Sequence, residues 1–315
     1  MGAFIKFIKE WMLVIGMVTG ASAYIIYHSI PALAPAGPVL LETCRKLQPA
    51  LLFTMLFLTF SKVDPHDMKP QAWQWKALLI QALSFMLLAV FLLLFPDMAC
   101  RIGVESLMLC MICPTATACA VVTDKLGGDI TGVMSYTVMI NLVTAVLVPL
   151  FVPLIHPAGG MTFFKSFCII LSKVFPLLIM PCLCAWLVRY QLPALHDRLV
   201  RYTWLSFYIW AFSLMLAILM STRAIFHHDG SAWVLAEIAA ASLVSCAVQF
   251  MSGKKVGAKY GHRITAGQSM GQKNTVFAIW MGYTFFDPVT SLAGGFYSIW
   301  HNIYNSWQLH QAGKK

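Results

Sequence analysis

The sequence GQSMGQKNT at residues 267–275 places glycines, polar side chains and one lysine in the middle of an otherwise apolar segment. A second run, CPTATAC at residues 113–119, places Pro114 among small residues inside another apolar segment. Proline removes an amide donor and clashes with the preceding helical turn, and glycine disfavours a continuous helix. Both runs therefore predict a break in a helix, with Pro114 and Gly271 as the breaking residues.

The chain around these runs has the composition of a membrane protein. Of its 315 residues, 59% are hydrophobic and 11% are charged, which is too little polar surface to cover a soluble globule. Apolar stretches of roughly 20 residues, the length that crosses about 30 Å of hydrocarbon, recur from Trp11 to Trp307. Hydrocarbon offers no partner for a free backbone amide, so each stretch is expected to be helical. The predicted fold class is an all-α membrane protein.

The two runs occupy matching places in the two halves of the chain. Lys273 follows Thr117 by about half the chain length, and the runs fall in the fourth and ninth of ten expected spans. Interrupted helices at corresponding positions are typical of transporters built from inverted repeats. We therefore expect ten transmembrane helices as two five-helix repeats, residues 1–160 (TM1 to TM5) and residues 161–315 (TM6 to TM10). The spans are expected to begin near Trp11, Gln48, Trp73, Gly103, Asp129, Phe163, Tyr202, Ala232, His262 and Pro288.

A simpler interpretation remains open for both runs. Pro114 can kink a helix without ending it, and small or polar residues also form packing seams between membrane helices.

The distribution of basic residues predicts the orientation of the chain. With the N-terminus in the cytoplasm, fifteen of the 22 lysines and arginines lie in cytoplasmic loops or termini. The positive-inside rule therefore places both termini on the cytoplasmic side of the cell (inner) membrane. Because the net charge of +10 follows this asymmetry, it does not indicate a nucleic-acid partner.

Motifs for enzymatic chemistry are not found in the sequence. It has no nucleophile elbow, His-Glu-x-x-His motif or phosphate-binding glycine loop, so we expect no enzyme activity and no cofactor. Cys110 and Cys113 have the spacing of metal ligands but no second pair, so no metal site is expected.

Three motifs resemble the bile acid:sodium symporter family. They are residues 113–117 with the Gly-Gly-Asp turn at 127–129, residues 271–275, and FYSIWHN at 296–302, which is similar to the family's Phe-Ser-Val-Trp-His-Asn signature. The resemblance covers nearly the whole chain. It implies that the two repeats intertwine into one core domain and one panel domain, with broken helices 4 and 9 crossing at the substrate and ion sites.

The resemblance also implies a substrate site at this crossing. Thr117 and Asn274 resemble the family's substrate-contacting threonine and asparagine, and His301 and Asn302 resemble a pair that lines the cavity. The N-termini of half-helices carry partial positive charge and free amides, which favour a carboxylate or sulfonate. The expected substrate-binding residues are Thr115, Thr117, Lys273, Asn274, Thr275, His301 and Asn302.

The sodium sites that the resemblance implies are altered in this chain. Cys119-Ala120 stands where the family has a Ser-Asn pair, Ser269 stands at a glutamate position and Lys273 at a glutamine position. Sodium requires oxygen ligands, preferably with a carboxylate, and an ammonium at the same place repels it. We therefore expect no sodium coupling through these sites. The equivalent positions are Gln81, Cys119, Ala120, Thr137, Asn141, Ser269, Gln272 and Lys273.

Lys273 has three candidate functional roles, since an ionisable residue at membrane depth is costly and marks function by default. It stands in for the sodium ion by donating to backbone carbonyls, pairs with an anionic substrate, or takes up and releases a proton. The structural alternative is a lysine that snorkels or pairs with an acid such as Glu237.

These features predict a secondary active transporter of a small organic anion, bile-acid-like or a simpler carboxylate or sulfonate, that works by alternating access. The expected partners are the substrate, the lipid bilayer and, as a candidate coupling ion, a proton. Two alternatives remain: sodium-coupled symport of an organic anion, and a non-transporting membrane sensor that binds such an anion.

Overall fold

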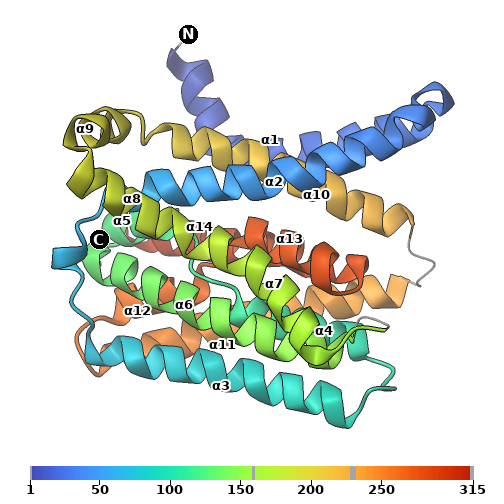
Figure 1. The fold of residues 1–315 in the computed structure, drawn as a ribbon. Coiled ribbons are helices and arrows are strands. Elements are labelled where there is room, and N and C mark those ends of the chain that lie inside the picture. The colour runs from blue at the N-terminus through green and yellow to red at the C-terminus, as the bar shows by residue number, and fades with distance from the viewer. Residues whose placement is uncertain (1, 158–159, 228–231, 313–315) are drawn as a thin grey trace.

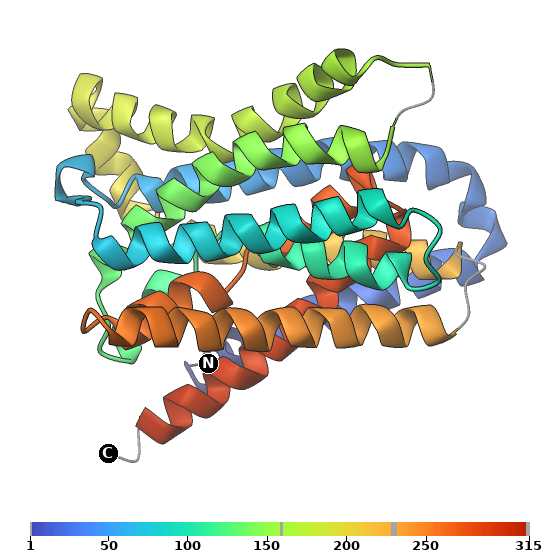
Figure 2. The ribbon, with the colours of Figure 1, turned by 90° about the horizontal axis from the view of Figure 1, so that it is seen from below.

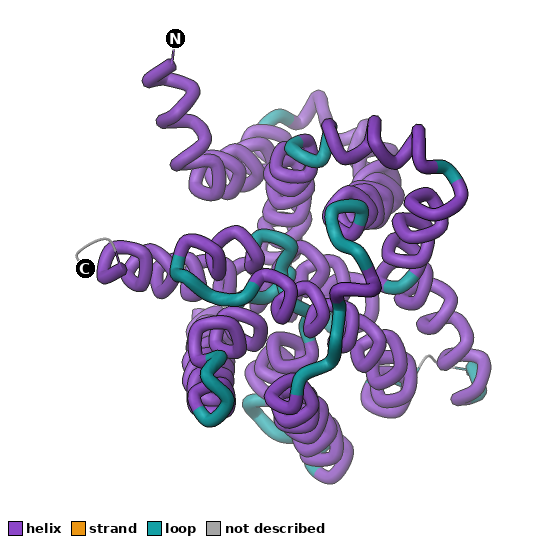
Figure 3. The backbone as a smooth tube through the Cα atoms, turned by 90° about the vertical axis from the view of Figure 1, so that its left-hand side faces the viewer, coloured by secondary structure: helices purple, strands orange, loops and turns teal. Residues whose placement is uncertain are grey.

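The computed structural model describes residues 2–157, 160–227 and 232–312, and these residues form helices without a β-strand. Figure 3 shows the helices joined by short loops. The α-helices are α1 (Gly2–Ser29), α2 (Gly37–Phe60), α3 (Ala72–Leu94), α4 (Arg101–Ile112), α5 (Cys119–Lys125), α6 (Ile130–Ile155), α7 (Phe163–Leu178), α8 (Met180–Gln191), α9 (Pro193–Arg201), α10 (Leu205–Phe226), α11 (Ala232–Ala258), α12 (Arg263–Gly271), α13 (Thr275–Phe285) and α14 (Leu292–Ala312). Three short 3-10 segments are η1 (Pro31–Ala36), η2 (Pro65–Asp67) and η3 (Pro288–Ser291).

The helices have the length and surface of membrane spans. Four of those described are long and apolar enough to cross a membrane, namely α3, α6, α11 and the Tyr208–Phe226 part of α10. The number rises to six if each of two bent pairs is one span, α1 with α2 (bent by 110°) and α7 with α8 (bent by 41°). Large apolar side chains such as Leu87, Leu94, Phe164 and Trp233 are exposed, as expected for a surface that faces lipid. The described residues are therefore all-helical with four to six candidate membrane spans, which is consistent with the predicted all-α membrane protein.

The helices differ from the sequence-based expectation in two ways. Two of them start earlier than expected, and one of these is α1, which begins at Gly2 rather than near Trp11. α2 begins at Gly37, well before Gln48, because Pro38 suits the first turn of a helix and the polar residues that follow form an exposed turn. An ion pair between Glu42 and Lys46, 2.6 Å apart, stabilises that turn. The second difference is α9, an amphipathic helix with no buried residue, which occupies a segment expected to be a loop.

The helices pack in two groups. α2 packs against α8 and α10, and α10 against α1; this set is the upper layer in Figure 1. α11 packs against α4, α12 and α14, and α3 packs against α4 and α6. Figure 2 shows α3 and α11 of this second group side by side. α13 contacts both α14 and α10, so it lies where the two groups meet.

Candidate functional site

Two interrupted helices meet inside the protein. The helix that ends at Ile112 resumes at Cys119, and the helix that ends at Gly271 resumes at Thr275. We call residues 113–118 the first break and residues 272–274 the second break. They lie antiparallel, with Thr115 opposite Lys273.

Backbone hydrogen bonds join the two breaks directly. The Ala116 amide donates to the Gln272 carbonyl at 2.8 Å, and the Asn274 amide donates to the Pro114 carbonyl at 2.8 Å. Each break thus supplies partners that the other lost when its helix ended.

The local sequence explains why both helices end here. Pro114 has no amide to continue the hydrogen-bond ladder. Gly271 is closely covered by the ring of Phe250, so a Cβ atom at this position would overlap that ring. Asn274 then starts the next helix, because its Oδ1 accepts from the Phe277 amide at 3.2 Å.

Side chains from α3 and α6 satisfy the carbonyls at the end of α4. The Gln81 amide nitrogen donates to the carbonyls of Met111 (2.8 Å) and Cys113 (3.2 Å). The Tyr136 hydroxyl donates to Oε1 of Gln81 at 2.6 Å and so fixes the amide. The Thr144 hydroxyl donates to the Ile112 carbonyl at 2.9 Å. In this structure Gln81 therefore supports the break in α4.

Carbonyls around the second break also have donors, and none of these donors is Lys273. The Thr115 hydroxyl donates to the Ser269 carbonyl at 2.7 Å, and the Tyr297 hydroxyl donates to the Gly271 carbonyl at 2.8 Å. The Cys113 thiol lies 3.0 Å from the Asn274 carbonyl and donates to it.

Lys273 is buried, with only 1% of its surface exposed. Its Nζ atom has no hydrogen-bond partner in the described part of the chain. The alternative in which Lys273 pairs with Glu237 is therefore wrong, and the Glu237 side chain instead lies beside Gly103 on α4.

Further buried polar atoms without a hydrogen-bond partner in the described chain gather around the second break. Native proteins leave few such atoms unpaired, so a cluster of them needs an explanation. They are Ser269 Oγ, Gln272 Oε1, Asn274 Nδ2, Ser298 Oγ and His301 Nδ1.

A cavity of about 540 Å³ lies against both breaks. Its wall includes six of the seven expected substrate-binding residues, Thr117, Lys273, Asn274, Thr275, His301 and Asn302. Thr115 is not part of the wall, because its hydroxyl is turned to the Ser269 carbonyl. The lining also includes residues at or after the end of α2 and at the start of α10, namely Thr59, Lys62, Trp204, Ser206 and Trp210.

The positions equivalent to sodium ligands are divided between the cavity wall and the buried interior. Ala120, Gln272 and Lys273 line the cavity, whereas Gln81, Cys119 and Ser269 are buried outside its wall. The Thr137 hydroxyl donates to the Val133 carbonyl within its own helix, and the Asn141 amide donates to the Leu178 carbonyl at 3.4 Å. The described residues also contain no group of three His, Cys, Asp or Glu side chains that could hold a metal ion.

Two contributions to the site escaped the sequence analysis. Tyr136 positions Gln81, and Tyr297 binds the Gly271 carbonyl. Tyr297 lies four residues before His301 on the same face of α14, so helical spacing within the FYSIWHN motif could have indicated it.

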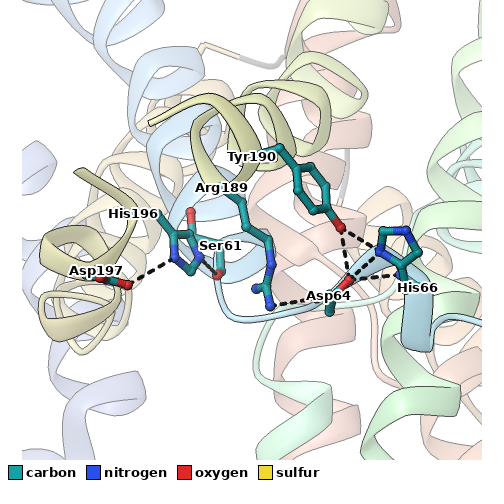
Figure 4. Close-up of polar contacts among 7 residues, drawn as sticks. All are labelled: Ser61, Asp64, His66, Arg189, Tyr190, His196 and Asp197. Atoms are coloured by element: carbon teal, nitrogen blue, oxygen red, sulfur yellow. Dashed lines mark hydrogen bonds and ion pairs between the residues drawn. The ribbon is translucent and has the colours of Figure 1, made fainter. Parts of the chain in front are cut away.

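The segment between α2 and α3, whose Lys62 and Val63 line the cavity, is held at both ends. Asp64 accepts hydrogen bonds from Arg189 (2.8 Å) and Tyr190 (3.0 Å) on α8, as Figure 4 shows. At the other end the Gln71 amide donates to Asp129 at 3.2 Å. These contacts tie the segment to α8 on one side and to the start of α6 on the other.

The charge of Asp64 is stabilised by its surroundings. Hydrogen bonds from the His66 amide and ring, and from Tyr190, hold the pKa of the Asp64 carboxyl well below its usual range. Asp64 is therefore expected to be ionised at neutral pH.

Comparisons with known protein families and with curated proteins find no match for this chain.

Proposed function

We propose that this protein is a secondary active transporter of a small organic anion that works by alternating access. The observation that carries the proposal is the pair of interrupted helices, whose breaks contact each other beside a cavity of about 540 Å³. Discontinuous helices that meet at a central site are a recurring construction of secondary transporters, where the half-helix ends face substrate and ions.

The charge of the site favours an anion. The cavity wall contains Lys273 and Lys62 but, among the described residues, only Asp124 as a carboxylate. The positive N-terminal end of α13 begins at Thr275, which also lines the cavity. A carboxylate or sulfonate, whether bile-acid-like or smaller, suits this arrangement.

The proposal includes the architecture of the bile acid:sodium symporter family. If α4 with α5, α7 with α8, and α12 with α13 each form one interrupted span, the chain crosses the membrane ten times. Residues 1–160 and 161–315 would then be inverted repeats, intertwined into a core domain and a panel domain. The separate packing of the α1, α2, α8 and α10 group supports the division into two domains.

In the proposed orientation both termini are in the cytoplasm, and the membrane is the cell (inner) membrane. Lys62, Lys125 and Arg189 then lie near the cytoplasmic surface. The cavity, lined by Lys62 and Asp124 at this end, would open to the cytoplasm.

The proposed transporter does not use the family's sodium sites. Ser269 and Lys273 stand where oxygen ligands are needed, and the side chains of Thr137 and Asn141 are bonded elsewhere. The carbonyls at the breaks already have other donors, which disfavours Lys273 as a structural substitute for sodium. We therefore assign Lys273 to the substrate anion or to a coupling proton.

Substrate counterflow in proteoliposomes tests the proposal. A thermal-shift screen of organic acids first identifies a ligand, since binding stabilises a protein by an amount set by ligand concentration over Kd. Wild-type protein should then exchange labelled for unlabelled ligand across the membrane. Binding without counterflow would instead identify a sensor.

Variants and ions then separate the coupling modes. Lys273→Gln should reduce counterflow at least tenfold, which corresponds to about 1.4 kcal/mol. Lys125→Gln, an exposed lysine on α5, should leave it unchanged. Replacing sodium by potassium or choline should have no effect, and a requirement for sodium would establish sodium-coupled symport. Unchanged transport by Lys273→Gln at every pH would exclude the assigned role of Lys273.

A further inference from the structure

A second cavity, of about 660 Å³, lies among α1, η1, α2 and α10 and shares no lining residue with the first. In Figure 1 the elbow between α1 and α2 is at the upper right, above the end of α10. We call this second cavity the elbow groove.

The floor of the elbow groove is apolar. Leu41 and Leu47 of α2 line it together with Leu216 and Met220 of α10. Leu216 and Met220 belong to a buried cluster with Cys44, so this floor is a packed part of the protein.

The rim of the groove is basic. Tyr24 and His28 of α1, Arg223 of α10 and His227, which directly follows α10, lie on it. The Tyr24 hydroxyl is 3.3 Å from Nδ1 of His227, and the rings of Tyr24 and His28 stack with centroids 5.9 Å apart. No acidic side chain is among the described residues that line the groove.

Arg223 is the principal cation of the rim. It is half-buried, and within residues 2–157, 160–227 and 232–312 its guanidinium has no hydrogen-bond or ion-pair partner. A partly desolvated guanidinium without a carboxylate is poorly compensated, and its planar donors match a phosphate with two parallel hydrogen bonds.

We propose that the elbow groove binds an acidic phospholipid, with its phosphate on Arg223 and an acyl chain along the floor between α2 and α10. The basic rim is complementary to the phosphate of such a lipid, and the apolar floor is complementary to its acyl chain. The groove also has the volume of ordinary small-molecule sites. Exposed apolar side chains flank the groove, including Ile26 on α1 and Val39 on α2, and exposed Leu40 lines it, so the bilayer itself supplies the ligand. The proposal does not depend on transport activity.

Lipid binding by the purified full-length protein tests the proposal. Delipidated protein in detergent is titrated with dioleoyl phosphatidylglycerol or phosphatidylcholine, and bound lipid is counted by native mass spectrometry. Wild-type protein should bind one phosphatidylglycerol in preference to phosphatidylcholine. Arg223→Gln should bind phosphatidylglycerol at least about tenfold more weakly, which is the loss expected when a charge-assisted contact is removed.

A second variant tests the groove without touching Arg223. Leu40 lines the groove and is half-exposed, so Leu40→Glu places a carboxylate at the lip without disturbing the core. It should weaken phosphatidylglycerol binding as strongly as Arg223→Gln. The matched controls are Arg45→Gln and Val39→Glu, which alter exposed residues of α2 outside the groove and should bind lipid as the wild type does.

Three outcomes would overturn the proposal. The first is equal lipid binding by wild type, Arg223→Gln and Leu40→Glu. The second is an equal loss of phosphatidylglycerol binding in the two control variants, which indicates general attraction of anionic lipid. The third is binding of a soluble alkyl sulfonate in the groove with no binding of phospholipid. Unfolding curves without lipid identify a variant that fails to fold. If either Arg223→Gln or Leu40→Glu fails to fold, the lipid binding of the other variant tests the proposal.

Discussion

The first and second breaks end their helices in the same way but differ in how their polar groups are satisfied. At the first break the Thr115 hydroxyl has a partner, and Gln81 binds two carbonyls at the end of α4. At the second break Gln272, Lys273 and Asn274 each carry a buried polar atom without a partner in the described chain.

This difference indicates which break stabilises the fold and which break offers polar groups to a ligand. A buried polar group with a partner stabilises the fold modestly, whereas one without a partner costs free energy. Proteins break local rules mainly at functional sites. We therefore infer that the first break holds the site in shape, and that the second break carries the groups that act on substrate or ion.

The largest effect on folding is expected at the support of the first break. Gln81→Leu leaves two carbonyls and the Tyr136 hydroxyl buried without partners. Since each orphaned group costs about 1–3 kcal/mol, the loss should be roughly 3 kcal/mol or more. Titration of unfolding with SDS in mixed micelles measures it.

The matched control for Gln81→Leu is Tyr136→Phe, which removes one hydrogen bond and leaves the carbonyls satisfied. It should cost about 1 kcal/mol. Equal losses for the two variants would show that Gln81 does not support the break.

A smaller loss is expected where the second break meets its neighbour. Gly271→Ala places a methyl group against the Phe250 ring and should destabilise the protein by about 1–3 kcal/mol through overpacking. In the control Gly295→Ala, the nearest atom to the new methyl group is 3.6 Å away, so stability should change little. The same unfolding titration compares them, and an unaffected Gly271→Ala protein would contradict the close packing.

A third substitution tests whether the polar groups of the second break serve folding at all. Lys273→Met keeps a long side chain and removes an amine that has no hydrogen-bond partner in the part of the chain that the structure describes. Stability should therefore stay the same or rise, because apolar replacements of buried charges are often neutral or stabilising. The apparent Tm in detergent reports this. A clear drop in Tm would mean that Lys273 does stabilise the break.

A small, pH-dependent effect is expected outside both breaks, at Asp64. Because its folded pKa is lowered, ionised Asp64 contributes stability above the ordinary aspartate value of about 3.9, and this contribution is lost as pH falls through the folded value. Wild-type protein should therefore exceed Asp64→Asn in Tm at pH 7, and the difference should shrink below about pH 4. The exposed Asp67→Asn variant should show no such trend, and a pH-independent difference for Asp64→Asn would refute the electrostatic origin.

Most of the candidate site could be located from local sequence. Pro114 and Gly271 mark positions where a helix is costly, and the polar run after Gly271 stands out in an apolar segment whatever the rest of the chain does. The start of α2 and the existence of α9 were missed, since a polar turn at a helix end and an exposed amphipathic helix give no apolar signal.

By itself the sequence determined the all-helical character and the apolar spans, because stretches of this length with no partner for backbone amides in hydrocarbon favour helices. Only the tertiary structure decided which polar groups have partners. It directs the Thr115 and Tyr297 hydroxyls to the Ser269 and Gly271 carbonyls, and it leaves the Lys273 amine without a hydrogen-bond partner among the described residues. Such pairings join residues far apart in the chain, and they depend on the rotation of each helix, which local composition does not encode.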